Sequence, residues 1–370
     1  MDTDDERCES SGFAPLAEAD DAAQVRIDDA GQLIAALPAI FRFVPTRSLV
    51  VALICPSADS TTPARAIPAV VRFGLDAITD PAGIEETVAQ LEAICHRANA
   101  TATVAVVVDD RPRAALTARL AVDLLQSAEV KLIGAWLVPT IAAGASYRSL
   151  LDGDTDGIVN DPATSPLACV QALDGVQIHS SRHELADLIA VDPTAAAALT
   201  PLIDPAVQRY RAELAAAVAA DCGTAFQSDT AKAVLELIAV GCESGCTPKD
   251  LATAVAALRD VMIRDVMLGL TGTGWAPSAQ ILWQSVARAS TGRDRAEAAM
   301  LCGYDAYHRG DAVYARICLE EALRADSEHA MAVVLNTALD NGERPARIAM
   351  IAHAGRGVAA GMGIDLTATA

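Results

Sequence analysis

The 370-residue chain has few aromatic residues: phenylalanine, tryptophan and tyrosine together make up 4% of it. Surfaces that bind single-stranded nucleic acid use such side chains to stack against the bases. The chain also lacks net positive charge, since its formal net charge is −20 at pH 7. Nucleic-acid binding depends on cationic side chains that displace counterions from the phosphates. Both shortages argue against a general nucleic-acid-binding protein, although they do not exclude a local basic patch.

Long apolar runs are also missing. No stretch of about 18 apolar residues runs without a charge or a turn residue, so we expect no membrane-spanning helix. The first residues, MDTDDERCESS, are acidic and contain neither the basic nor the apolar region of a secretory signal. The nine cysteines are scattered and odd in number, which does not indicate a disulfide framework. We therefore predict a cytoplasmic protein with reduced thiols.

Charge is spread unevenly along the chain. Up to Asp29 there are ten carboxylates and two arginines, so about −8 of the net −20 lies in this segment. Residues 1–24 have few large apolar side chains whose burial could offset the entropy lost on folding. We predict that 1–24 is a disordered acidic tail.

Residues 25–192 combine short β-branched runs with amphipathic segments. The runs at 48–54, 66–75, 103–108 and 130–138 predict strands. The segments 29–41, 81–98 and 113–128 have apolar residues at helical spacing, although Pro38 falls inside the first one. Strand, helix and strand alternate over 103–138, which is typical of a βαβ unit. The prediction is an α/β domain over 25–192, with a mixed or parallel sheet flanked by helices.

The character of the sequence changes near residue 193. Alanine makes up about a fifth of the chain, and beyond this point it occurs with leucine, arginine and glutamate at helical spacing. We predict an all-α domain over 193–355, followed by a flexible tail at 356–370. The expected helices cover residues 205–220, 229–240, 248–268, 278–289, 294–309, 311–325, 328–340 and 345–354.

Polar residues flank two of the predicted strands. Arg47 and Ser48 precede or begin one strand, and Asp109 and Asp110 follow the strand at 103–108. Ligands of open α/β sheets bind beyond the carboxyl ends of the strands, so these four residues form a candidate ligand crevice. The plainer interpretation is that the two aspartates are simply polar residues in the loop that follows the strand. If they serve a ligand, Asp109→Ala should leave stability nearly unchanged.

Motifs that would bind a cofactor or metal are missing or incomplete. Neither a dinucleotide-binding nor a phosphate-binding glycine loop occurs after a strand. Asp152, Asp154 and Asp156 resemble the front of a calcium loop, but position twelve is Ala163 where a glutamate is needed. Cys242 and Cys246 have no second pair at a zinc-finger distance. We expect no cofactor, no metal site and no assigned catalytic residue.

One segment of the helical half resembles a tetratricopeptide unit, in which two helices pack through small residues at fixed offsets. Two positions differ from that pattern, Ala299 and Ser327, and no second unit follows 34 residues later. The plainer interpretation is an ordinary helix hairpin inside a helical domain, and the other is a peptide-binding groove. The residues that match the pattern are Gly303, Tyr307, Gly310, Asp311, Ala315, Leu319, Ala322 and Asp326.

Several blocks together resemble an actinobacterial family known only as domain of unknown function family forty-one ninety-two. The most specific block is LIAALP at 33–38 followed by FVPTRSLVV at 43–51. Similar blocks occur at 81–138, 161–168 and 181–185, and around Trp283, Gly310–Asp311, Ala315 and Ala322–Leu323. Relatives commonly have glycine where Arg42 stands, which raises the question of the turn geometry there. The resemblance covers about residues 25–340 and implies no activity.

Two functions fit these observations. The first is a non-catalytic interaction or regulatory protein that binds a protein partner through its helical domain. The second is a small-molecule enzyme with its crevice at the strand ends. The sequence decides neither between them nor on the oligomeric state.

Overall fold

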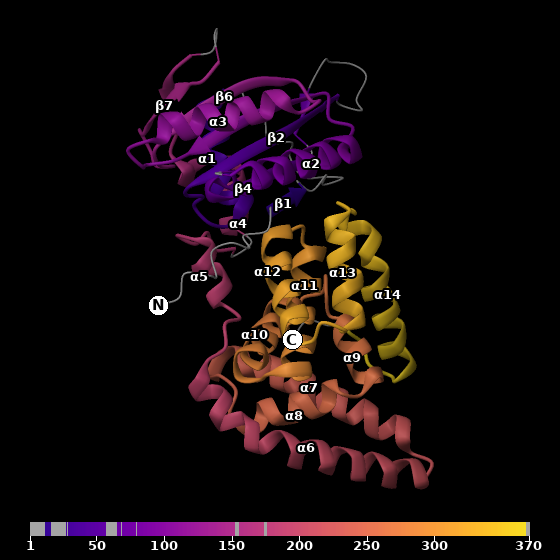
Figure 1. The fold of residues 1–370 in the computed structure, drawn as a ribbon. Helices are drawn as coiled ribbons and strands as arrows, with labels where there is room; N and C mark the ends of the chain where they lie inside the picture. Colours follow the sequence, from indigo (N-terminus) through magenta and orange to yellow (C-terminus); the bar gives the residue numbers. More distant parts are fainter. Residues whose placement is uncertain are drawn as a thin grey trace. The chain divides into compact units, whose positions relative to one another are not determined.

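Strands and helices alternate in the first half of the chain, as the sequence predicts (Figure 1). The computed structural model describes residues 12–15, 27, 29–56, 65–67, 69–78, 80–151, 155–173 and 176–367. The strands lie in the order β1-β4-β2-β5-β6-β7-β8, and β3 pairs with β2. Their bounds are β1 (Gly12–Pro15), β2 (Ser48–Pro56), β3 (Arg65–Ala66), β4 (Ala69–Gly74), β5 (Ala102–Val108), β6 (Leu132–Val138), β7 (Ser146–Ser149) and β8 (Gly157–Ile158).

The sheet is mixed. Strand β2 is antiparallel to both β4 and β5, whereas β5 and β6 are parallel. Helix α3 (Ala114–Ser127) connects β5 to β6, which confirms the predicted βαβ unit. Helix α2 (Pro81–Ala98) begins where Asp80 accepts a hydrogen bond from the Gly83 amide and ends at Asn99 in a left-handed conformation.

The main apolar core of this part lies between the sheet and helices α2 and α3. Alternate residues of each strand point to one face, so Leu49, Val51 and Val107 share it. They pack against helix residues such as Leu91 and Leu125, all of them buried. Figure 1 shows α2 and α3 lying along the sheet.

Helix α1 (Ala30–Phe41) leads into the segment that carries the family resemblance. It begins at Asp29, which caps the Gln32 amide, and it contains Pro38. It ends at Arg42, whose φ of 61° is left-handed. That conformation suits glycine best, so the glycine common in relatives has a physical reason. Beyond Arg42, Phe43 and His179 form a parallel bridge.

Four shorter helices complete the elements up to residue 187. They are the 3₁₀ helices η2 (Leu75–Ile78) and η3 (Pro162–Thr164), with α4 (Pro166–Leu173) and α5 (Arg182–Asp187). Within α5, Glu184 accepts hydrogen bonds from Ser180, and the Ser181 hydroxyl accepts one from the Glu184 amide. These contacts form a reciprocal cap at the start of the helix.

The second half is helical, as predicted. Thr247 and Asp250 form the capping box that begins α8. The predicted helix at 248–268 is two helices, because Asp260 takes an extended conformation and caps α9. The helices are α6 (Pro193–Ala219), α7 (Gly223–Ser244), α8 (Pro248–Leu258), α9 (Val261–Leu268), α10 (Ala276–Ala289), α11 (Gly292–His308), α12 (Ala312–Ala325), α13 (Ala330–Asp340) and α14 (Pro345–Gly361).

Helices α11 and α12 form a hairpin over the residues that match the tetratricopeptide pattern. Gly310 turns the chain between them with a φ of 79°. A Cβ placed on Gly303 would lie 2.9 Å from Leu319 Cγ, so the missing side chain permits close packing of the two helices. Residues 295–307 of α11 are all buried, which makes this helix the centre of the helical part.

Three observations refine the predicted domain limits. The chain divides into two compact units, Met1–Leu185 and Ala186–Ala370, rather than at residue 192. Residues 12–15, inside the predicted tail 1–24, form β1 and pair with β4. At the other end, α14 continues to Gly361, and Ile364 and Leu366 are buried. Much of 356–370 therefore packs within the helical unit.

Other predictions fall on residues that the structure does not describe. The remainder of the acidic tail and the first three residues of the calcium-like loop, 152–154, lie outside the described residues. So does the side chain of Cys242, the first member of the cysteine pair. None of the helices in the described part of the chain is both long and apolar enough to cross a bilayer.

Candidate functional site

Three loops meet at one end of the sheet. Strand β2 begins at Ser48, which pairs with Gly74 at the end of β4 and with Val108 at the end of β5. Because β2 runs antiparallel to both neighbours, its start lies beside their ends. The turn before β2, helix η2 after β4 and the loop after β5 therefore share this end, which we call the strand-end site.

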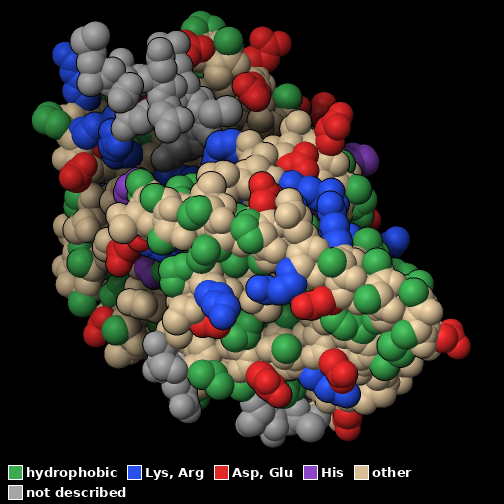
Figure 2. All heavy atoms as spheres, turned by 90° about the horizontal axis from the view of Figure 1, so that it is seen from below, with side chains coloured by type: hydrophobic (Ala, Val, Ile, Leu, Met, Phe, Trp, Pro, Cys, Tyr) green, Lys and Arg blue, Asp and Glu red, His purple; other side chains and the backbone are tan. Residues whose placement is uncertain are grey.

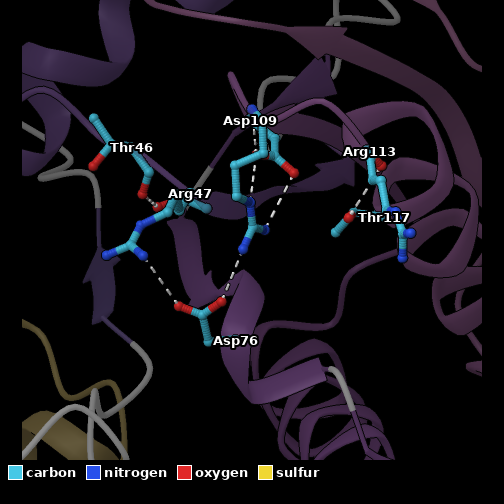
Figure 3. Close-up of polar contacts among 8 residues, drawn as sticks. Thr46, Arg47, Asp76, Asp109, Arg113 and Thr117 are labelled. Carbon is cyan, nitrogen blue, oxygen red and sulfur yellow. Dashed lines mark hydrogen bonds and ion pairs between the residues drawn. The ribbon is translucent and has the colours of Figure 1, made fainter. Parts of the chain in front are cut away.

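An ion network connects these loops (Figure 3). Arg111 donates to both carboxylate oxygens of Asp109, from Nε at 2.8 Å and from Nη2 at 3.2 Å. Its backbone amide also donates to Asp109, at 3.1 Å. On the other side, Arg111 Nη1 lies 3.1 Å from Asp76, and Arg47 Nη1 lies 3.7 Å from the same carboxylate. Two arginines and two aspartates thus alternate along one chain of contacts.

Burial differs sharply within this network. Asp109 is 1% exposed, whereas the side chains of Arg47 and Asp76 are about half exposed, at 49% and 56%. The hydrogen bond to Asp109 is the main cause that raises the pKa of Arg111. The charges of the four residues cancel, so the network holds the strand ends together and leaves no excess charge for a ligand.

The Ser48 hydroxyl, at the same end of the sheet, already has hydrogen-bond partners within the protein. It donates to the Thr46 carbonyl at 2.6 Å and accepts from Arg72 Nε at 2.8 Å. The guanidinium of Arg72, itself buried, lies 5.5 Å from the centre of the Phe43 ring. This is a cation–π contact, and it ties the segment before β2 to strand β4. Ser48 is fully buried and so is not presented as a nucleophile.

The structure therefore brings together some of the predicted site residues. Arg47 and Asp109 belong to one network, whereas Ser48 bonds to Arg72. Asp110 is exposed and forms no hydrogen bond or ion pair with these described residues. Sequence reasoning missed Asp76 and Arg111, the residues that make the connection. Asp76 had a usable signal, because it follows a predicted strand in the same way as Asp109.

Arg47 has an unusual backbone. Its φ is 44°, a left-handed value that is uncommon for residues with a side chain. Such conformations cost about 1–3 kcal/mol and often occur where function constrains the chain. Arg113 and Thr117 lie at the start of α3, on the other side of Asp109 in Figure 3. Among the described residues, no group of three or more His, Cys, Asp and Glu side chains is arranged to hold a metal ion.

The helical unit has a second notable surface on its last two helices. Val333, Val334 and Met350 are 42%, 60% and 72% exposed. Helices α13 and α14 follow each other along the chain, and each packs on α11. We call Val333, Val334 and Met350 the terminal apolar face. On the face of the molecule drawn in Figure 2, hydrophobic, acidic and basic side chains are interspersed outside the grey atoms.

The structure defines the class of this protein: an α/β unit is followed by a helical unit, and a closed ion network lies at the strand ends. A protein family described as a domain of unknown function (DUF4192) matches residues 31–346. The match covers most of the 370 residues, so the chain belongs to this family. A search of the curated proteins and a search of the solved structures found no match.

Proposed function

We propose that this protein is a non-catalytic interaction protein whose helical unit binds a protein partner through the terminal apolar face. The observation that carries the proposal is the exposure of Val334 and Met350, at 60% and 72%, on two consecutive helices. Apolar side chains that are exposed to water favour burial against a partner. The tetratricopeptide-like pattern of α11 and α12 adds support, since helix hairpins of that type commonly serve as binding scaffolds.

The strand-end site supports a structural role rather than catalysis. A general acid or base must reach its substrate, and a nucleophile must be exposed. Asp109 is buried with both oxygens bonded to Arg111, and the Ser48 hydroxyl is buried between Thr46 and Arg72. None of the seven cysteines in the described part of the chain is in a disulfide, which agrees with the cytoplasm of an actinobacterium as the expected setting.

The test compares partner capture by three forms of the full-length chain. The wild type, a Val334→Asp/Met350→Asp double variant and a Val240→Asp control are tagged and exposed to lysate of the native organism. Val240 is 61% exposed on α7, so it matches Val334 in chemistry and exposure. Mass spectrometry should find a protein retained by wild type and control and lost from the double variant. Equal recovery with all three forms would contradict the proposal.

A small-molecule enzyme is the second candidate, favoured by the left-handed φ of the half-exposed Arg47 at the strand ends. Arg47 and Asp110 are then the predicted crevice residues that remain accessible to a ligand. A metabolite panel should raise the melting temperature of the wild type, and Arg47→Ala should abolish that rise. A panel without effect on the wild type would remove this candidate.

A further inference from the structure

Helix α14 is largely apolar on two opposite sides. Its 17 residues include no carboxylate and two arginines, Arg347 and Arg356. One side faces the helical unit, where α14 contacts α9 and α11, and its buried residues are Ile348, Ala352, Gly355 and Ala359. The opposite side is exposed, and we call it the outer α14 face: Arg347, Met350, Ala354, Gly357 and Gly361. A helix that is apolar all round is normally buried, so this face calls for a cover.

The outer α14 face has the spacing of a helix–helix contact. Its residues follow one another at intervals of three and four, the repeat by which one helix packs along another. Met350 is its large apolar side chain and is 72% exposed. A Cβ added at Gly357 or Gly361 would meet no atom within 4 Å, so the surface there is open. A second helix can come close at these glycines, because no side chain stands in its way.

Gly357 lacks an explanation within the fold of one chain. Glycine inside a helix is less favourable than alanine. At Gly355 the reason is visible, since an added Cβ would lie 2.3 Å from the Asp265 carbonyl oxygen. No such neighbour limits Gly357 in the described part of the chain. Close approach of another molecule would supply the missing reason.

Charge favours a second copy of this chain as that molecule. The formal net charge of the chain is −20, so two copies repel each other over much of their surface. Because α14 contains no carboxylate, two copies can meet there without opposing negative charges. Exposed Asp365 follows the end of the helix by four residues, and exposed Arg347 lies near its start. The two ends of the face therefore carry complementary charges.

The two halves of the outer α14 face differ in size, which selects an orientation. The first half carries Arg347 and Met350, whereas the second half has only alanine and glycine, up to Gly361. An antiparallel pair of helices places the large half of each copy on the small half of the other. It also brings Arg347 of one copy near Asp365 of the other. A parallel pair would instead place Met350 against Met350 and leave a gap between the glycines.

We propose that the protein partner of the terminal apolar face is a second copy of this chain, held by an antiparallel contact between the two α14 helices. Met350 of each copy packs on Gly357 and Gly361 of the other, so two-fold symmetry uses the same contact twice. The proposal rests on the proposed function, because Met350 belongs to the terminal apolar face. A helix of 17 residues is about 25 Å long, so the interface is small and the dimer should dissociate on dilution.

Sedimentation velocity of the purified full-length chain, with no other protein present, tests this proposal. The wild type should have the mass of two chains at high concentration and approach one chain on dilution. Met350→Glu places a carboxylate in the contact and should raise the dissociation constant at least about tenfold. Val240→Glu on α7 is the matched control, since Val240 is 61% exposed, and it should sediment as the wild type does.

Gly361→Leu separates the close contact from non-specific association. The added side chain is apolar and enters open space in the single chain, so the fold should persist, which circular dichroism checks. It should nevertheless weaken the dimer about tenfold or more, because it keeps the helices apart. Unchanged or stronger association of Gly361→Leu would overturn the proposal.

A wild type that stays monomeric at every concentration would also overturn it. If the capture from lysate still depends on Val334 and Met350 in that case, the proposed function stands and a different protein covers the face. If the capture fails as well, both proposals are wrong.

Discussion

Asp109 shows how burial changes the expected role of a residue. Because Asp109 follows a strand, the sequence indicates a candidate ligand-binding residue. Its removal should then hardly change the stability of the chain. The coordinates reverse this expectation, since Asp109 is 1% exposed and accepts three hydrogen bonds from Arg111. The network could not be predicted from sequence, because it depends on the order β4-β2-β5 that places Asp76 beside Asp109.

We predict that Asp109→Ala destabilises the chain by about 1–3 kcal/mol, because Arg111 loses its acceptors at the strand ends. The neighbouring Asp110→Ala removes an exposed carboxylate and should change stability by less than about 0.5 kcal/mol. Urea unfolding of both variants checks the difference. Equal midpoints would mean that the Arg111 contacts contribute nothing to stability.

At the scale of elements, periodicity and caps predicted most of the fold. The strand at 103–108 and the helices at 81–98 and 311–325 are close to their predicted limits. The predicted helix limits were wrong where one residue could lie either inside a helix or at its cap. Asp260 serves as a cap and splits a predicted helix. Gly355 lies inside α14, and its lack of a side chain lets this helix pack on the Asp265 and Gly269 backbone.

Two glycines in helices should respond oppositely to the same substitution. In Gly303→Ala the new Cβ lies 2.9 Å from Leu319 Cγ, and we expect a loss of about 1–3 kcal/mol from overpacking. In Gly357→Ala the Cβ meets no atom within 4 Å, so the better helix propensity of alanine should add about 0.5–1 kcal/mol. Thermal unfolding compares the two variants. A gain in Gly303→Ala would contradict the close packing of α11 and α12.

At the scale of the whole molecule, the division into two units differs from the predicted boundary at 192. The sequence predicts this boundary at the proline and alanines that begin α6. In the structure, Ile189 and Asp192 already belong to the helical unit: the Ile189 carbonyl accepts from buried Arg295 at 2.8 Å. Asp192 caps α6, and its amide donates to the Arg288 carbonyl. Contacts of this kind join distant segments and leave no periodic signal.

A fragment of residues 186–370 should therefore be more stable than one of residues 193–370. The shorter fragment lacks the α6 cap, which contributes about 1 kcal/mol, and leaves Arg295 without the Ile189 carbonyl. Circular dichroism during heating compares the two fragments. Identical melting temperatures would place residues 186–192 outside the helical unit.

The central claim is that the terminal apolar face binds a protein partner. Hydrogen–deuterium exchange of the full-length chain, with and without the partner recovered by capture, tests it most directly. We predict slower exchange on binding in α13 and α14, over residues 330–340 and 345–361, with little change at the strand-end site. Protection confined to residues 44–48 and 109–113, with none in α13 and α14, would contradict the claim.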